Sequence, residues 1–391
     1  MYPILYDSKS TEWSTLGIGP LSDAISCYVT EERNGVYELK MEYPINGLHY
    51  ESLKEGALIK AKANDTSVLQ IFRTYRAEKS FDNRINIEAE HISYALNNYP
   101  FLGTNFLETS FVNKAPTNAV SYVFSKSPIG VYVASPLSLD GFTFWSDITS
   151  QKTFDFPDPC SIRSFLGGKE NSLLNLWQGE FEFDNKAIKY YQNRGRDNGV
   201  IIKFGKNMTD LMQEISIEGL YTHVFPYARK TIFPNQGDPY DVYIFASSTN
   251  ANRVIPIMDG NQPLYLKYGF VRTKYLDLSD KFDPDDEISE SDVLSAANSY
   301  ISANTGIQKP KITLTVSFQP LKQKDDNGLI ANLEKVSLCD SVTVVHPRLG
   351  INEKLKVNKT VYNVLTEKYK SIEIGDPKSN FSDTVFDQFE L

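Results

Sequence analysis

The sequence predicts a mainly β, multidomain protein of the β-rich α+β class, with two similar small β-barrel domains and α+β domains inserted between them. Three observations predict this fold class. The chain has 391 residues, and single cores stop growing at about 250–300, so two to four domains are expected. Tyr and Phe, 23 of each, favour pleated, half-buried surfaces. Short alternating segments separated by turn residues fill most of the chain, and a similar three-strand order occurs near each end.

The composition excludes several classes of protein. A hydrophobic content of 41% and a charged content of 23% are typical of a globular protein. The net charge of −9 and the lack of a basic cluster argue against sequence-specific nucleic-acid binding. No apolar run approaches the roughly 18 residues of a membrane span, and the N-terminus lacks the pattern of a signal peptide.

The cysteines do not predict a disulfide framework. Cys27, Cys160 and Cys339 are far apart, odd in number and form no CxxC pair. We expect each to be a small buried apolar residue, in a chain made in a reducing cytosol.

The first β segment is predicted to begin with a hairpin. Asn34-Gly35 separates ISCYVTEER from VYELKMEYP, and this dipeptide favours a tight type I′ turn. The second arm alternates polar and apolar residues, which indicates a strand with one buried face. The strands LKEGALIKAK, VLQIFRTYRAEKSF and RINIEAEHIS follow, and together they define a first β-barrel domain over residues 1–95.

Residues 96–205 are expected to form an inserted α+β domain. A helix is predicted over Pro116–Ser125, with the proline in its first turn. A second helix over Ser161–Leu166 is expected to end at Gly167-Gly168. Three strands should follow, within LLNLWQGEFEFD, AIKYYQNRG and GVIIKFG.

The remaining residues are divided between a second barrel and a further insertion. A strand pair is expected over Met208–Arg229, and Ser289 with Asp292 forms the capping box of a helix over residues 290–304. The assignment is a second β-barrel domain over residues 206–232 and 308–378. It places an inserted segment at 233–307 and a C-terminal tail at 379–391.

The two ends of the chain show a similar order of strands. LKEGALIKAK, LQIFRTYRAEK and RINIEAE near the start correspond to VSLCDSVTVVH, LKVNKTVYNVL and YKSIEIGD near the end. The alignment equates Thr74 with Thr360, and Ile85/Ile87 with Ile372/Ile374. Either these segments are a duplicated barrel, or they are unrelated meanders that resemble each other because short meanders generally do.

The search for catalytic chemistry assigns no residue. The four histidines His49, His91, His223 and His346 form no metal-ligand motif, and a structural role is expected for His91 and His346 at strand ends. No Cys-His protease context, GxSxG elbow or Walker loop is present. The glycines of FLGGKENS, Gly167 and Gly168 before Lys169, are better explained as a helix-ending turn.

Two acidic groups can be interpreted in a second way. Glu180 and Glu182 share one face of a predicted strand and can act as an acid/base pair, but EFEFD is also typical of a strand with one wet face. The loop with Asp283, Asp285, Asp286 and Glu287 resembles the start of a calcium loop, but an acid-rich helix start explains it more simply. The sequence therefore predicts no catalytic, cofactor-binding or metal-binding residue, and no cofactor.

Several segments, in order, resemble the phage minor structural protein family, also called the prophage endopeptidase tail family. The strongest are LEKVSLCDSVTVVHPRLGINEKLKVNKTVYNVLTEKYKSIEIGD and IRSFLGGKENSLLNLWQGEFEFDNKAIKYYQNRGRDNGVIIKFGKNM. Weaker ones are ISCYVTEERNGVYELKMEYP, HISYALNNY, GFTFWSDI and GLYTHVFPYARK, so the resemblance runs from about residue 20 to 376. It implies the fold of a tail hub: two barrel domains that form a trimeric ring, with further domains inserted between them.

The resemblance also implies a function. We expect a structural hub at the tail tip of a virion, made in the host cytoplasm. Its expected partners are two further copies, the distal tail protein, the tape-measure protein and the tail tube, with a possible contact to the host cell wall, and it would gate DNA passage. Some members of the family carry a lytic domain, but SNFSDTVFDQFEL is too short to hold one, so we expect no enzyme activity. The alternatives are a tail-associated peptidoglycan endopeptidase or hydrolase, and a saccharide-binding module that uses Trp145 or Trp177.

Overall fold

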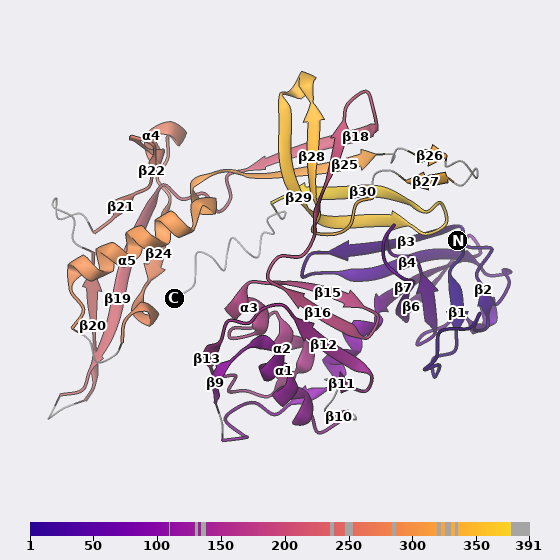
Figure 1. The fold of residues 1–391 in the computed structure, drawn as a ribbon, viewed down its shortest axis with the longest axis horizontal. Helices are drawn as coiled ribbons and strands as arrows, with labels where there is room; N and C mark the ends of the chain where they lie inside the picture. Colours follow the sequence, from indigo (N-terminus) through magenta and orange to yellow (C-terminus); the bar gives the residue numbers. More distant parts are fainter. Residues whose placement is uncertain are drawn as a thin grey trace. The chain divides into compact units, whose positions relative to one another are not determined.

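The computed structural model divides into two compact units, which are described separately. Unit 1 comprises residues 1–212 and 315–374, and unit 2 comprises 213–314 and 375–391. The strands and helices are labelled in Figure 1. The structure describes residues 1–108, 110–129, 132–133, 138–234, 238–246, 253–283, 287–318, 322–324, 330–332 and 335–376. The expected C-terminal tail, 379–391, therefore lies outside the described residues, as do Asp285 and Asp286.

The N-terminal part of unit 1 is a β-sheet that contains the five strands predicted from the sequence, β3 to β7, and two short strands that were not predicted, β1 and β2. They are paired antiparallel in the order β3-β4-β7-β6-β5-β1-β2. The strands are β1 (Ile4–Tyr6), β2 (Gly19–Pro20), β3 (Ser26–Glu32), β4 (Tyr37–Pro44), β5 (Leu58–Ala61), β6 (Gln70–Ser80) and β7 (Arg84–His91), with the 3-10 turn η1 (Tyr50–Ser52). Alternate residues of β3 and β4 are buried, as the period of two predicts.

The turn between β3 and β4 differs from the predicted type I′ turn. Such a turn needs two residues with positive φ, but only Asn34 (φ 56°) adopts one, and Gly35 does not. The side chain of Asn34 has another role, because its Nδ2 donates to the Gly179 carbonyl and its Oδ1 accepts from the Phe181 amide. The requirement to hold this neighbouring segment explains the asparagine without a type I′ turn.

The C-terminal part of unit 1 repeats the strand order of the N-terminal part. Strands β28 (Ser341–His346), β29 (Ile351–Asn363) and β30 (Lys368–Gly375) form an antiparallel meander, and the 3-10 turn η5 (Pro347–Leu349) joins the first two. Strands β18 (Met208–Ser216) and β25 (Lys311–Phe318), each of which runs across the boundary between unit 1 and unit 2, extend the order to β18-β25-β30-β29-β28. This is the order β3-β4-β7-β6-β5 of the N-terminal part, and we call the two sets of strands module 1 and module 2.

Hydrogen bonds show that the two modules correspond residue by residue. In module 1 the amide of Gly56 donates to the carbonyl of Thr74, and the amide of Thr74 donates to that of Ala57. In module 2 the amide of Cys339 donates to the carbonyl of Val357, and the amide of Val357 donates to the carbonyl of Asp340. The same pattern therefore recurs 283 residues later.

The backbone conformation and the register agree with this correspondence. Gly56 (φ 81°) and Cys339 (φ 70°) both have positive φ. The register of the middle strand shifts immediately after Thr74 in module 1 and immediately after Val357 in module 2. The sequence alignment therefore needs a correction of three residues, because Thr74 corresponds to Val357 and not to Thr360. Ile87 likewise takes the place of Ile372, since their partners in the middle strands, Ala77 and Thr360, correspond.

The two modules, each of which was expected to be a small β-barrel domain, are joined in one continuous sheet. One edge of β29 pairs with β28 through residues 351–356, and beyond that point residues 359–363 pair with β3. Since β29 extends beyond its ladder with β28, the additional backbone groups are satisfied by β3. Strand β17 (Asp197–Lys203) pairs parallel to β28 and completes the 13-stranded sheet.

Between the modules, unit 1 contains a smaller α+β part with an aromatic core. Both predicted helices are confirmed: α1 covers Pro116–Ser125 with its proline in the first turn, and α2 covers Ile162–Leu166 between Ser161 and Gly167. The run LLNLW was expected to be a strand but forms α3 (Leu173–Trp177), because the Ser172 side chain caps it by accepting from Asn175.

The remaining elements of this part of unit 1 are short. They are η2 (Ile92–Asn98), β8 (Pro100–Phe101), β9 (Phe111–Lys114), β10 (Tyr132–Val133), β11 (Ser138–Leu139), β12 (Phe142–Ser146), β13 (Lys152–Phe154), β14 (Cys160–Ser161), β15 (Glu180–Asp184) and β16 (Ala187–Tyr191). Strand β16 pairs antiparallel with β15 and parallel with β12.

Unit 2 is a four-stranded sheet with a helix. Strand β19 (His223–Ile232) pairs with β20 (Tyr240–Phe245), β21 (Ile255–Pro256) and β24 (Thr273–Asp277), so it does not form the expected pair with β18. Helix α5 (Glu290–Ala303) begins with the predicted capping box of Ser289 and Asp292, and buries Val293 and Ala297 in the core of this unit.

Short elements complete both units. They are α4 (Leu264–Tyr268), β22 (Met258–Asp259), β23 (Gln262–Pro263), η3 (Ser279–Lys281) and η4 (Thr305–Gln308), with β26 (Lys322–Lys324) and β27 (Ile330–Asn332). Among the described residues, no helix is long and apolar enough to cross a membrane.

The aromatic core of unit 1 gives the first prediction. Phe165 is fully buried and its ring lies 5.4–5.7 Å from those of Phe101, Phe111 and Phe156. Because the substitution leaves a cavity, Phe165→Ala should lower the free energy of unfolding by about 3–5 kcal/mol in denaturant titrations. The matched control, Phe81→Ala, removes a fully exposed ring and should change it by less than about 0.5 kcal/mol. Equal effects of the two substitutions would contradict the prediction.

Candidate functional site

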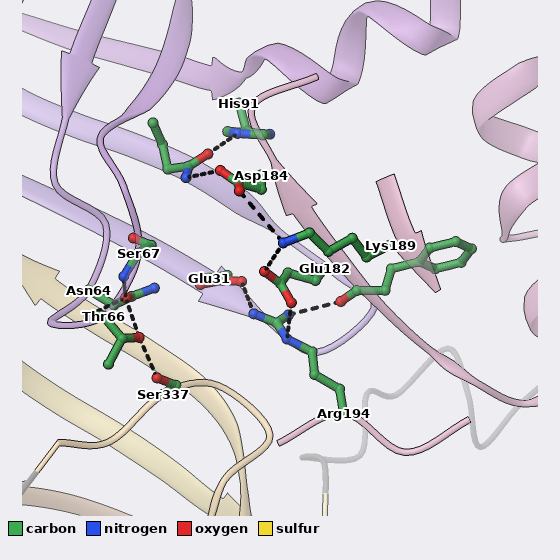
Figure 2. Close-up of polar contacts among 12 residues, drawn as sticks. Glu31, Asn64, Thr66, Ser67, His91, Glu182, Asp184, Lys189, Arg194 and Ser337 are labelled. Carbon is green, nitrogen blue, oxygen red and sulfur yellow. Dashed lines mark hydrogen bonds and ion pairs between the residues drawn. The ribbon is translucent and has the colours of Figure 1, made fainter. Parts of the chain in front are cut away.

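Among the described residues, buried charged side chains gather where the two modules meet strands β15 and β16, and we call this group the polar junction. Figure 2 shows its part around Glu31, Glu182, Lys189 and Arg194. All its members belong to unit 1. They are Glu31, Arg33, Gln70, His91, Glu180, Glu182, Asp184, Lys189, Arg194, Asp340 and Lys356.

Glu180 lies at the centre of one half of the junction. Its side chain is only 9% exposed, and both carboxylate oxygens lie 2.6 Å from Lys356 Nζ, on β29. Arg33 donates to Oε1 at 3.3 Å, and the amide of Arg194 donates to Oε2 at 2.6 Å. One carboxylate therefore links module 1, module 2 and strand β15.

Arg194 forms the other half of the junction. Its guanidinium donates to Glu31 Oε1 at 3.1 Å and to the Phe181 carbonyl at 2.9 Å, and lies 3.9 Å from Glu182. Burial is the largest single influence and opposes its charged form, but the surrounding groups Glu31, Cys339 and Glu182 together outweigh burial, so the pKa of Arg194 is raised. Lys189 lies 3.0 Å from Glu182 and 3.6 Å from Asp184. The carboxylates Glu180 and Glu182 are thus both ion-paired with cations.

A neutral chain of hydrogen bonds continues the junction into module 1. His91 is fully buried, and its Nε2 lies 3.0 Å from Gln70 Oε1. Gln70 Nε2 then donates to Asp184 at 3.0 Å. Since His91 Nδ1 accepts from the Ser93 amide, the ring proton is on Nε2. Burial, with a smaller contribution from the Arg163 charge, lowers the pKa of His91 to about 3, so this ring is neutral in the folded protein.

Two hollows adjoin the junction. A cleft of about 650 Å³ is lined by Glu182, Arg194, Arg196 and Asp340 among others, and it has the size of a small-molecule site. Several of its charged side chains already have partners: Arg194 lies 3.9 Å from Glu182, and Asp340 accepts from the backbone amides of Arg196 and Ser337 at 2.7 and 2.8 Å. A smaller cavity of about 210 Å³ is lined by Glu31, whose Oε2 has no hydrogen-bond partner among the described atoms. Such polar, enclosed space is suited to ordered water.

The predicted histidines lie apart, in separate elements. His91 and His346 end strands β7 and β28, as predicted, and His346 Nδ1 accepts from the Leu349 amide. His223 lies 3.0 Å from the Thr222 hydroxyl, in unit 2, and its ring stacks on Tyr265. His49 precedes η1 with a φ of 66°. Among the described residues, no group of three or more His, Cys, Asp or Glu side chains is placed to hold a metal ion.

The cysteines and tryptophans have distinct environments. All three cysteines are free thiols; Cys27 and Cys339 are buried, whereas Cys160 is only partly buried. Trp177 is a core residue whose Nε1 donates to the Ser150 carbonyl, but Trp145 is 50% exposed and packs against Tyr191. Of the two tryptophans named for a saccharide-binding surface, only Trp145 lies at the surface.

Sequence reasoning found Glu180 and Glu182 but missed their partners. Arg33, Arg194 and Lys356 are separated from Glu180 by 147, 14 and 176 positions, and no local pattern connects them. The only available signal was a polar residue inside a β segment with clear alternation, such as Lys356 in LKVNKTVYNVL.

The sequence matches a family model over residues 196–385, and the description of that family is prophage endopeptidase tail. This match covers just under half of the chain and supports a phage tail protein family for it. None of the curated proteins matches the tail protein significantly.

Solved structures of other tail proteins share its fold. Prophage tail protein gp18 from Listeria monocytogenes is 13% identical with a TM-score of 0.57, and the match covers 99% of this chain and 98% of that one. A 43 kDa tail protein of prophage MuSo2 from Shewanella oneidensis is 11% identical with a TM-score of 0.52, covering 96% and 98%. A tail protein from Neisseria meningitidis is 8% identical with a TM-score of 0.53, covering 96% of each chain. At these identities the similarity shows the fold alone.

The junction predicts a large effect of removing one charge. Glu180→Gln keeps the shape of the side chain but leaves Lys356 and Arg33 without their counter-charge. The free energy of unfolding of the tail protein should fall by about 2–4 kcal/mol, less than for a fully buried pair because both cations keep some hydration.

A matched control removes a carboxylate from an exposed pair. Glu42 pairs with Arg84 at 3.3 Å, and both side chains are nearly half exposed. Glu42→Gln should change the free energy of unfolding by less than about 1 kcal/mol. If Glu180→Gln has as small an effect in the same denaturant titration, the junction does not hold unit 1 together.

His91 predicts a pH dependence. Its pKa in the fold is about 3, whereas an unfolded histidine titrates near 6.5. Below about pH 6.5 the unfolded chain binds a proton that the folded chain does not. Stability should therefore fall as the pH drops from 6.5 towards 3, by up to about 1.4 kcal/mol per pH unit.

The measurement compares the wild type with His91→Gln. Their unfolding free energies should differ by a constant amount above pH 7, and the difference should shrink as the pH falls from 6.5 to 5. Parallel pH profiles over this range would show that His91 does not titrate as described.

Proposed function

We propose that this tail protein is a structural hub at the distal tip of a phage or prophage tail. Three copies form a ring that joins the tail tube and the distal tail protein to the tip and gates the passage of DNA. The single observation that carries the proposal is the repeated module of unit 1, with its strand order and hydrogen bonds matched across an offset of 283 residues.

The repeat supports the proposal through symmetry. A chain with two similar modules presents six of them when three copies surround an axis, so a trimer can meet a partner of sixfold symmetry. The polar junction supplies the rigidity that such a ring requires, because it holds both modules and strands β15 and β16 together. The acidic chain, with a net charge of −9, repels the phosphate backbone of DNA, which suits passage more than binding.

The junction favours a structural role for Glu180 and Glu182 over an acid/base role. A general acid and base need different environments that separate their pKa values, whereas each of these carboxylates is engaged by cations. The hydrolase hypothesis is testable on a cell-wall zymogram: lysis by the wild type that a well-folded Glu182→Gln variant loses would revive it.

The hub proposal predicts a stoichiometry. Cryo-electron microscopy of tails that contain this chain should show three copies at the tip, with the two modules alternating at steps of about 60° around the tail axis. The expected neighbours are the last ring of the tail tube and the distal tail protein. Two or six copies, or density for the chain away from the tip, would contradict the proposal.

A further inference from the structure

Strand β18 has an unpaired edge where its counterpart in module 1 has a partner. In the order β18-β25-β30-β29, β18 takes the place of β3, and no described strand pairs with its outer edge. The corresponding edge of β3 carries β29. β18 is also poorly covered, with Met212 53% and Ile215 60% exposed, whereas β3 buries Cys27 and Val29. Exposed apolar residues on an unpaired strand indicate an interface.

The outer half of β6 has an unpaired edge of the complementary kind. The ladder between β5 and β6 ends at Arg73, so Arg76–Ser80 pairs only with β7 among the described strands. In module 2 the ladder between β28 and β29 ends at Lys356, the equivalent residue, and the following backbone of β29 pairs with β3. Residues 359–363 of β29 join the two modules within one chain. Their counterpart in module 1, Arg76–Ser80, has no partner on the same edge among the described strands.

The charges of the two edges match those of the existing joint. At that joint Lys359 lies opposite Glu32 and forms an ion pair of 2.6 Å. The register equates Lys359 with Arg76, which is 55% exposed, and β18 carries Asp210 and Glu214 on its exposed residues. Arg76 contacts Glu78 and Glu88 of its own chain. The pair with Glu78 is exposed and the pair with Glu88 is half-buried, and surface ion pairs of this kind cost little to exchange.

We propose that β18 of one copy pairs antiparallel with Arg76–Ser80 of β6 in a second copy, which repeats between chains the joint of β29 with β3. This inference rests on the proposed hub function, and it names the contact through which the copies of the hub would associate. It is heterologous, because two different edges meet, so a chain of such contacts must close into a ring. With one joint inside each chain and one between chains, three copies close a ring of six modules.

Interchain disulfide trapping tests this pairing on the full chain. Ala77 corresponds to Thr360, which lies opposite Glu31 in the existing joint. Ala77→Cys is combined in turn with cysteine at Asp210, Leu211, Met212 and Gln213, since one of four consecutive positions must come within the reach of a disulfide. Ala77→Cys alone is the control for Cys27, Cys160 and Cys339, and the oxidised protein is analysed on denaturing gels and by peptide mass spectrometry.

We expect cross-links between Ala77→Cys and alternate positions of β18, and the largest cross-linked species should contain three chains. A trimer in sedimentation velocity that forms no such cross-link would overturn the pairing and leave the hub proposal intact. Absence of both a trimer and cross-links up to the highest soluble concentration would also overturn it, while the copy number in whole tails decides the hub proposal separately.

Charge reversal gives a second, independent readout. Arg76→Glu should weaken self-association at least tenfold, and so should Asp210→Arg combined with Glu214→Arg. In an equimolar mixture both contacts between unlike variants are complementary, but a ring of three must contain one repulsive joint between like variants, so the mixture should associate without closing the ring. All three changes in one chain should restore the ring. Lys126→Glu with Lys169→Glu, on exposed residues away from both edges, is the control. Equal loss in the control, or no restoration in the combined chain, would contradict the proposed contact.

Discussion

The structure of unit 1 depends on one strand that is longer than the ladder beside it. Along a single edge, β29 pairs first with β28 and then with β3, so its 13 residues belong to both modules. A backbone edge that is left unpaired and buried costs free energy at each amide and carbonyl. The residues of β29 beyond its ladder with β28 therefore need another strand to hydrogen-bond their backbone, and β3 is that strand. The position of module 2 relative to module 1, the location of Lys356 and the polar junction all follow from this pairing.

The junction shows why charge is placed at such a joint. Hydrophobic contacts alone allow two sheets to slide, because dispersion and burial are weakly directional. Glu180 receives donors from β29, from the β3–β4 loop and from the segment after β16. A buried ion pair adds little net stability, but a misplaced strand would leave a buried charge unpaired. The junction therefore selects one register among those that the apolar pattern permits.

Much of the fold was predictable from sequence because its signals are local. Pro116 at a helix start, the capping box of Ser289 and Asp292, and the alternation in β3 and β4 each act over a few residues. The predictions that failed involve contacts between distant segments. The type I′ turn at Asn34 gives way to hydrogen bonds with Gly179 and Phe181, some 145 residues away. The repeat was visible, but its register was not: the bulges after Thr74 and Val357 set the alignment, and periodicity does not reveal a bulge. The site was found only as two glutamates, since its cations come from segments that only the folded chain brings together.

The joint between β29 and β3 also has a consequence for biosynthesis. The partner of β3 is made more than 300 residues after β3 itself, so an emerging chain carries the edge of module 1 uncovered until β29 has been made. During this interval Glu180 lacks Lys356, and the hydrophobic face that β29 will extend is open to wrong partners. Contacts so distant in sequence close slowly. The ribosome-bound chain therefore has its greatest need of a chaperone before β29 emerges, and a truncation that removes β29 would leave the edge of β3 unpaired.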